Sequence, residues 1–317
     1  MHSFIIINQV LILGILIYIG FVATKTCIIS ESLKEGIALL VFKITLPLMI
    51  FTNIADHNIT LALLKNGAMV IVLAYFSLFL LLLTGKLSTR IMKLNKHSGK
   101  IHTLHTVFGN HAFLGFPLIN ALFPGGEGLF YATLFYLVST SLTWTMGIYV
   151  LKSEKNAGVI SNLKNLLNRN TFAFFLGFLF MLLNIRLPGI LNTPLSGLGQ
   201  TTTYLSMLYI GAMLGRINLR SVFTFWSVFI LCFNKLLLIP FILIIIIGSA
   251  VSFFSLELNH IAKSVVILQS GMPCAALIVV LAGRFKADEK LATTNLFVST
   301  IMSLATLPLV YFLIEFL

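Results

Sequence analysis

The sequence predicts an all-α polytopic membrane protein with ten transmembrane helices, arranged as two inverted five-helix repeats. Three observations predict this fold class. The 317 residues are 58% hydrophobic and only 9% charged, with a mean hydropathy of +1.03, whereas roughly a quarter of the residues of a soluble domain are charged. Apolar stretches recur along the whole chain. The loops between these stretches alternate between many basic residues and few.

Ten stretches are long enough to cross about 30 Å of hydrocarbon, which takes roughly 20 helical residues. Glycines and prolines between residues 188 and 199 make the connection between the sixth and seventh stretches hard to delimit. The expected helices cover residues 4–23, 37–55, 67–85, 104–123, 128–151, 171–186, 197–215, 222–250, 261–283 and 292–316.

The basic residues support this count and orient the chain, because Lys and Arg collect in short cytoplasmic loops. The loops after the odd-numbered helices hold sixteen basic residues and the other loops hold three, so a missed helix would have removed the contrast. Both termini are therefore expected outside the cytoplasm. The sixteen are Lys25, Lys34, Lys86, Arg90, Lys93, Lys96, Lys100, Lys152, Lys155, Lys164, Arg169, Arg216, Arg220, Arg284, Lys286 and Lys290; the three are Lys65, Arg186 and Lys263.

An odd number of helices in each half means that the second half enters the membrane with the opposite orientation. Residues 1–152 and 170–317 are the expected repeats, joined by a cytoplasmic linker at residues 153–169. Pro117 and Pro273 lie 156 residues apart and fall in the fourth helix of each half. Paired interrupted helices are the best sequence indication of the binding site of a secondary transporter.

The two interruptions predict an anion site. A break frees backbone N–H and C=O groups, which are tolerated at membrane depth only where they face protein or a water-filled cavity. Proline suits the first turn of a helix, so half-helices are expected to begin near Gly115 to Pro117 and near Gly271 to Pro273. Their positive ends would then point to the midplane of the membrane and favour an anion.

Polar side chains beside the breaks fit the same expectation. Ser270 is expected to cap the second half-helix, and the Asn110 amide is expected to donate hydrogen bonds to a carboxylate. His111 adjoins Asn110 and is the only histidine expected within the core of a span. Because histidine titrates near neutral pH, His111 is a proton-coupling candidate, with a satisfied core histidine as the alternative. His102 and His105 are expected at helix ends.

Lysines inside the spans are functional candidates, because ionisable groups are costly in a membrane. No carboxylate is left inside a span to carry protons. Lys43 is close enough to the cytoplasmic face to extend its amine to the surface, whereas Lys235 is too deep. Three roles are open for Lys235: it neutralises a bound carboxylate, replaces a coupling cation, or binds the C-terminal carbonyls of an interrupted helix.

Several classes of protein are disfavoured. The net charge of +12 does not indicate nucleic-acid binding, because the basic residues lie between apolar stretches and are not gathered on one face of a folded domain. Three separate cysteines give no CxxC motif, and no Walker or HExxH motif is present. No cofactor or metal is therefore expected, apart from a coupling proton or sodium ion. A membrane enzyme would need a nucleophile with a base, and the hydroxyls of Ser139, Thr140, Ser141 and Thr143 have no histidine or acid nearby in sequence.

Five segments resemble the auxin efflux carrier family, which includes bacterial malate and malonate permeases and, more distantly, the plant PIN-FORMED carriers. The segments are Thr45–Phe51, Gly109–Pro117, Gly271–Pro273, Ala282–Phe285 and Leu304–Pro308. The resemblance covers nearly the full length, although the chain has no long central loop. It implies a bile acid symporter or NhaA-like architecture, in which helices 4 and 9 cross in a mobile core of helices 3–5 and 8–10, against a scaffold of helices 1, 2, 6 and 7.

The resemblance also implies roles for two residues. Asn110 matches the asparagine that contacts the substrate carboxylate in the plant carriers, and Gln269 lies where related symporters hold polar groups of a sodium site. The expected coupling residues are His111, Lys235 and Gln269. The expected substrate-binding residues are Asn110, His111, Gly115, Pro117, Gln269, Ser270, Gly271 and Pro273.

Together these features predict a secondary transporter of small organic anions, mono- or dicarboxylates, that works by alternating access as a multi-pass protein of the cytoplasmic membrane. Its partners would be the anion and the lipid bilayer, without nucleic acid, and a homodimer is left open. The alternatives are a sodium-coupled symporter of a larger organic anion, a channel-like uniporter, and a sensor that binds the anion without moving it.

Overall fold

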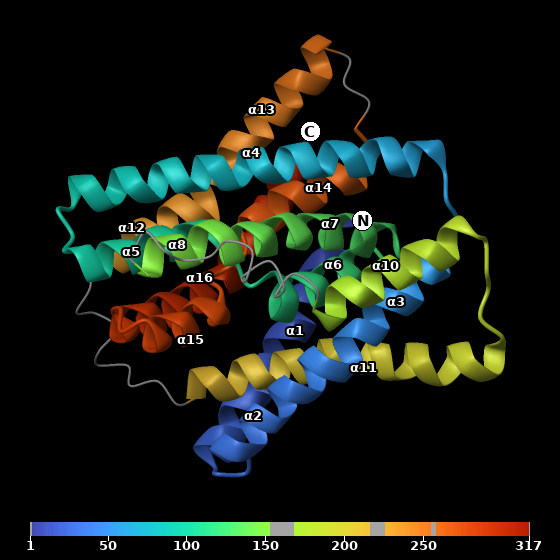
Figure 1. Ribbon diagram of the computed structural model, residues 1–317, viewed down its shortest axis with the longest axis horizontal. Helices are drawn as coiled ribbons and strands as arrows, with labels where there is room; N and C mark the ends of the chain where they lie inside the picture. The colour runs from blue at the N-terminus through green and yellow to red at the C-terminus, as the bar shows by residue number, and fades with distance from the viewer. Residues whose placement is uncertain (1, 153–167, 216–225, 255–257, 317) are drawn as a thin grey trace. The chain divides into compact units, whose positions relative to one another are not determined.

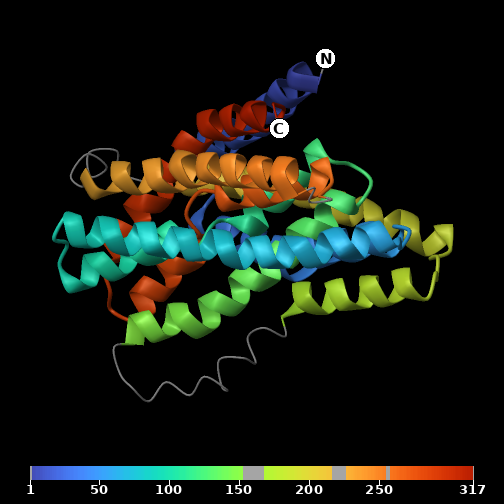
Figure 2. The ribbon, with the colours of Figure 1, turned by 90° about the horizontal axis from the view of Figure 1, so that it is seen from above.

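The computed structural model describes residues 2–152, 168–215, 226–254 and 258–316, which form helices and turns without a named strand (Figures 1 and 2). Five helical stretches in this part of the chain are long and apolar enough to cross a membrane: Glu31–Ala55, Leu61–Ile91, Glu127–Leu151, Trp226–Ala250 and Glu289–Ile314. Leu11–Lys25, His111–Leu122 and Arg169–Leu182 are shorter apolar stretches. The all-α membrane class is thus confirmed, while the ten-span count and the inverted repeat stay predictions.

The ten expected ranges fall mainly on helical residues, but residues 108–110, 183–186 and 271–275, inside the fourth, sixth and ninth expected spans, are not helical. Residues 153–167 of the expected linker and residues 222–225 of the eighth expected helix lie outside the described residues. The α-helices are α1 (His2–Lys25), α2 (Glu31–Leu40), α3 (Leu46–Ala55), α4 (Leu61–Ile91), α5 (Lys96–Val107), α6 (Phe116–Leu122), α7 (Glu127–Leu142), α8 (Ile148–Lys152), α10 (Arg169–Leu182), α11 (Gly189–Gly215), α12 (Trp226–Phe233), α13 (Ile239–Phe254), α14 (His260–Ser270), α15 (Ala276–Arg284) and α16 (Glu289–Ile314). The π-helical turns are η1 (Val41–Thr45), η2 (His111–Gly115), η3 (Thr143–Gly147) and η6 (Asn234–Leu238).

Three prolines follow a π-helical turn at the same distance. Pro47, Pro117 and Pro240 each lie two residues after the end of η1, η2 or η6. A proline has no N–H to donate, and its ring clashes with the carbonyl four residues earlier in a regular α-helix. A wider turn changes the bonding pattern at that point, one of the adjustments by which membrane helices accommodate proline. No proline follows η3, and nothing in the described residues explains that turn.

The chain divides into two compact units. Unit 1 is drawn from Met1–Ala68, Ala112–Leu134 and Leu167–Ile217, and unit 2 from Met69–His111, Phe135–Leu166 and Asn218–Leu317. Unit 1 contains α1, α2, α3, α10 and α11, the helices of the first, second, sixth and seventh expected spans, and it also takes α6 and the start of α7. The functional assignment of scaffold and mobile core stays a prediction.

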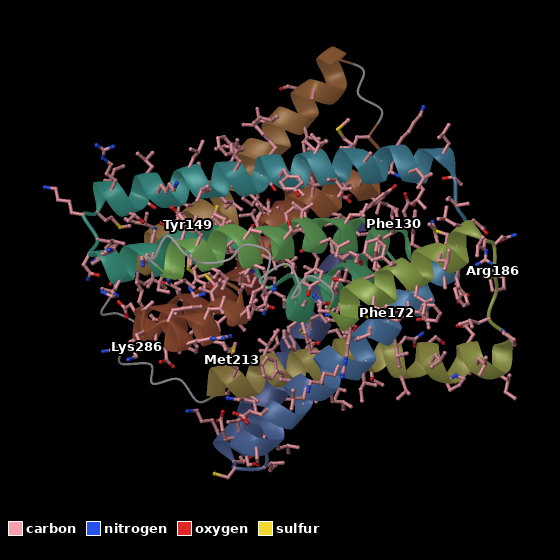
Figure 3. The ribbon with its side chains drawn as sticks, viewed as in Figure 1. Phe130, Tyr149, Phe172, Arg186, Met213 and Lys286 are labelled. Atoms are coloured by element: carbon pink, nitrogen blue, oxygen red, sulfur yellow. The ribbon has the colours of Figure 1, made fainter. Side chains whose placement is uncertain are left out.

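In unit 1, α1 packs along α11 and α10 packs along α3. Aromatic rings add to this packing. Phe130 of α7, which is labelled in Figure 3, stacks on Phe174 and Phe178 of α10, with ring centroids 5.9 and 6.1 Å apart. In unit 2, α16 is the central helix, since it contacts α5, α12, η6, α13, α14 and α15.

Helix α11 begins earlier than the sequence predicts. The expected start was residue 197, whereas the helix begins at Gly189 and runs through Pro194. Glycine served as a loop signal there, but Gly199 is a packing residue: a Cβ on it would lie 2.8 Å from the Met49 backbone nitrogen of α3. In α11, tertiary packing therefore overrides the tendency of glycine and proline to interrupt helices.

The contact between α1 and α11 generates a stability prediction. A Cβ on Gly211 would lie 2.0 Å from the Ile17 carbonyl oxygen and 2.8 Å from the Phe21 nitrogen, both backbone atoms that cannot rotate away. Gly211→Ala should therefore separate the helices and lower the stability of the purified protein by about 1–3 kcal/mol, the usual cost of overpacking. The thermal unfolding temperature in detergent measures this loss.

Gly14→Ala is the matched control on α1, because its Cβ would meet nothing within 4 Å. It should leave the unfolding temperature unchanged or raise it slightly, since alanine is the better helix former. If the Gly211 variant unfolds at the same temperature as the Gly14 variant, the close packing of α1 on α11 is wrong.

Candidate functional site

Two helical runs of unit 2 are interrupted. α5 ends at Val107, and Phe108 adopts extended backbone angles of φ −92° and ψ 123°. α14 ends at Ser270, and α15 begins at Ala276 after Ala275, which is extended at φ −74° and ψ 126°. Proline contributes to the second interruption because it disfavours helical angles in the residue before it and donates no N–H.

The two extended segments pair with each other. Gly109 and Cys274 form an isolated antiparallel bridge. The Asn110 N–H donates to the Pro273 carbonyl at 2.7 Å, and the Ala275 N–H donates to the Phe108 carbonyl at 3.1 Å. Backbone groups freed from two helices therefore satisfy one another. We call this pairing of Phe108–Asn110 with Pro273–Ala275 the crossing.

Lys235 binds the end of α5 beside the crossing. It lies in η6, is fully buried, and its Nζ donates to the carbonyls of Thr106 at 2.9 Å and Val107 at 3.2 Å. These carbonyls belong to the last turn of α5, where helical partners are missing. Within the described part of the chain no carboxylate pairs with Lys235, since the one ion pair there joins Lys34 to Glu31. The contact is the third of the roles that the sequence left open.

Polar side chains of α16 and His105 of α5 also hold the crossing. The Cys274 N–H donates to Ser299 Oγ at 3.0 Å. His105 Nε2 lies 3.2 Å from the Ala275 carbonyl, so this nitrogen carries the proton, and Asn295 Nδ2 lies 3.4 Å from His105 Nδ1. All three side chains are buried. The crossing is thus fixed by α16 as well as by its own two hydrogen bonds.

His111 and Gln269 form a second buried contact in unit 2. His111 Nδ1 lies 2.7 Å from Gln269 Oε1, and the His111 ring packs against Phe135 with a centroid distance of 5.1 Å. The exposed fractions of His111 and Gln269 are only 4% and 0%. His111 Nε2 and Gln269 Nε2 have no hydrogen-bond partner. The hydrogen-bonding capacity of the pair is therefore incompletely satisfied.

The structure brings together most of the residues that the sequence selected. Asn110, His111, Gln269, Ser270, Gly271, Pro273 and Lys235 all belong to unit 2, and Asn110 is buried. Gly115 and Pro117 belong to unit 1, where they lie at the end of η2 and the start of α6. Whether these residues bind substrate stays a prediction.

Two sequence-based expectations about local structure are wrong. Ser270 does not cap α15, because its hydroxyl donates to the Ile267 carbonyl of its own helix and Ala275 takes the N-cap position without a side-chain bond. The second half-helix begins at Ala276, not near Gly271 to Pro273. The first α-helix after the interruption, α6, does begin at Phe116, although the π-helical turn η2 before it already starts at His111. The residues at the crossing are held extended by long-range pairing, which a local proline signal cannot show.

Sequence reasoning also missed three residues of the site. His105 was expected at a helix end, but it is fully buried beside the crossing, and His102 is buried as well. Asn295 and Ser299 escaped notice because they lie in an apolar span. Their spacing of four residues, which places both on one face of α16, was the available signal.

A separate pocket lies in unit 1, with a volume of about 270 Å³. Asp56 contributes a carboxylate to it, and the Asn192 amide donates to that carboxylate at 2.8 Å. A carboxylate repels an anion, so this pocket does not suit the expected substrate. Its lining residues are Thr52, Asn53, Asp56, Gly125, Asn192, Ser196 and Gln200.

The apolar helices and the buried polar crossing define a multi-pass helical membrane protein. A family model described as membrane transport protein matches residues 5–162 and 157–311, so the chain belongs to this family of transporters, as its resemblance to auxin efflux carriers indicated. It is 26% identical over 310 residues to an "Uncharacterized transporter" of Methanocaldococcus jannaschii, which covers 95% of the chain and 96% of that relative. It is 28% identical over 314 residues to an "Uncharacterized transporter" of Methanothermobacter thermautotrophicus, with the same coverage.

The Lys235 contact gives a second prediction. Lys235→Met keeps an unbranched side chain but removes the donor to the Thr106 and Val107 carbonyls. Leaving buried carbonyls unpaired costs roughly 1–3 kcal/mol for each group, so the purified variant should unfold at a clearly lower temperature than wild type. Lys43→Met is the control, because Lys43 also lies in a π-helical turn before a proline but is exposed. Equal unfolding temperatures for the two variants would contradict the structural role of Lys235.

Proposed function

We propose that this chain is a secondary transporter that moves small organic anions, mono- or dicarboxylates, across the cytoplasmic membrane by alternating access. The observation that carries the proposal is the crossing, where two interrupted helices meet beside a fully buried lysine. Transporters built from inverted repeats bind their substrates where discontinuous helices meet. The family match supports transport but does not indicate the substrate. The proposal of an anion rests on the chemistry of the site.

The charges at the crossing favour an anion. Lys235 brings a basic group, and no carboxylate among the described residues pairs with it. The first turn of α15 starts after Ala275 without a side-chain cap, so its N–H groups contribute a partial positive charge. In our proposal the anion binds near these groups, with Asn110 donating to a carboxylate oxygen and Gln269, Ser270, Gly271 and Pro273 forming the opposite wall.

The same elements suit alternating access. Two hydrogen bonds and one lysine hold the crossing together, and the chain divides into two compact units. We propose that the helices of the expected scaffold stay fixed while the core moves, as in other transporters with gated repeats. Coupling to a proton or to sodium would act through His111, Lys235 or Gln269, which all lie in unit 2.

The proposed orientation predicts which loops face the cytoplasm. In a variant without native cysteines, His97→Cys should react with an impermeant thiol reagent only from the cytoplasmic side, and Pro124→Cys only from the outside, because basic residues mark the cytoplasmic loops. Both positions are exposed. A cysteine at Ser161, which lies outside the described residues, should react like position 97. Labelling of position 124 from the cytoplasmic side would contradict the topology and the inverted repeat.

Asn110 provides the test of the anion site. If its amide donates to a carboxylate, Asn110→Ala should cost about 1.5–3 kcal/mol, which corresponds to roughly ten- to a hundredfold weaker binding. Asn110→Asp should bind more weakly still, since it adds a like charge. Thermal-shift titrations of the purified protein with malonate, malate and succinate measure the affinity without a transport assay.

Asn66→Ala is the matched control, because Asn66 is also a buried asparagine but donates to the Ala62 carbonyl within its own helix. It should leave the affinity for the three acids unchanged. Unchanged affinity in both folded Asn110 variants would move the substrate site away from the crossing.

A further inference from the structure

The contact between His111 and Gln269 leaves a fixed set of hydrogen-bonding groups unused. In one arrangement, His111 Nδ1–H donates to Gln269 Oε1, so His111 Nε2 is a free acceptor and the Gln269 NH₂ is a free donor. In the other arrangement the amide is turned over, Gln269 donates to His111 Nδ1, and His111 Nε2–H becomes a donor while Gln269 Oε1 becomes an acceptor. With either tautomer of a neutral histidine, the pair therefore presents at least one donor and one acceptor.

Neighbouring groups do not supply the missing partners. The Phe135 ring that packs on His111 is apolar, and neither His111 Nε2 nor Gln269 Nε2 has a partner in the structure. Burying a polar group without a partner costs free energy, so such a group in a native protein calls for an explanation, of which a functional role is one. An enclosed pair with one free donor and one free acceptor is complementary to a ligand group that both accepts and donates.

We propose that His111 and Gln269 recognise a hydroxyl group on the transported anion, so that the preferred substrates are hydroxycarboxylates. A hydroxyl is both donor and acceptor, whereas an ionised carboxylate only accepts and would leave the acceptor of the pair unpaired. This inference rests on the proposed function, in which Asn110 binds the carboxylate. Since the pair is enclosed in this structure, the hydroxyl reaches it during the motion that alternating access requires.

The energetics predict measurable selectivity. A site built to bond a hydroxyl rejects the analogue that lacks it, because the buried polar groups are then left unpaired. The test compares acids that differ by one hydroxyl, malate with succinate and lactate with propionate, in thermal-shift titrations of the purified full-length protein. We expect wild type to bind the hydroxylated acid of at least one pair about tenfold more tightly or better.

Three variants separate recognition from stability. Gln269→Met keeps the side-chain length but removes the amide, and should lower the selectivity ratio severalfold by weakening the binding of the hydroxylated acid more than that of its analogue. Adding His111→Phe should bring the ratio to about one. Ser264→Ala is the control, because Ser264 is a buried residue of the same helix α14 whose Oγ also lacks a partner; it should keep the wild-type ratio. If the double variant does not fold, the selectivity ratio of the single variant Gln269→Met tests the inference.

The outcomes distinguish this inference from the proposed function. Equal binding of the members of both pairs by wild type would overturn the inference while leaving anion transport intact. A ratio that stays at the wild-type value in Gln269→Met would also overturn it, since the amide would then have no part in recognition. Binding of none of the four acids would contradict the proposed function itself.

Discussion

The rest of unit 2 depends on one constraint: backbone groups freed by a helix interruption must find partners at a depth where water is scarce. The crossing meets this constraint with two backbone hydrogen bonds between Phe108–Asn110 and Pro273–Ala275. The two last carbonyls of α5 take the amine of Lys235 instead. Each partner comes from a different part of the sequence, so these hydrogen bonds bring α5, η6 and the segment between α14 and α15 into one site. Ser299 and Asn295 of α16 also contact this site.

Four prolines show two different effects of proline in this chain, while Pro194 and Pro308 lie inside α11 and α16 without a preceding π-helical turn. Pro47, Pro117 and Pro240 lie in helices that continue past them, because a π-helical turn just before each one provides space for the ring. Pro273 lies in a segment that is not helical at all. The π-helical turns η1, η2 and η6 also hold Lys43, His111 and Lys235, respectively. Each π-helical turn that accommodates a proline therefore also positions an ionisable side chain, and two of these side chains, His111 and Lys235, belong to the candidate site.

The helices could be predicted from sequence because hydropathy and loop charge are strong, local signals, and most residues of the expected ranges are helical in the described chain. The interrupted segments could be located from their glycines and prolines as well. Their internal geometry could not be predicted. Ser270 donates to a carbonyl of its own helix, and α15 begins only at Ala276, because pairing with Phe108–Asn110 holds the preceding residues extended. His105, Asn295 and Ser299 were missed for the same reason, since only the fold brings them to the crossing. The depth of Lys235 was predictable, whereas its hydrogen bonds to the Thr106 and Val107 carbonyls depend on the tertiary fold.

The central claim is that the crossing belongs to a transporter that exposes one anion site alternately to the two sides of the membrane. Counterflow in proteoliposomes tests it most directly. Vesicles loaded with unlabelled malate or lactate are diluted into a trace of the labelled acid, without any imposed ion gradient. Alternating access predicts transient, saturable accumulation of label that depends on the internal acid, because each inward step of the labelled acid is followed by an outward step with the unlabelled acid. Label that merely equilibrates, at a rate indifferent to the internal acid, would identify a channel and contradict alternating access.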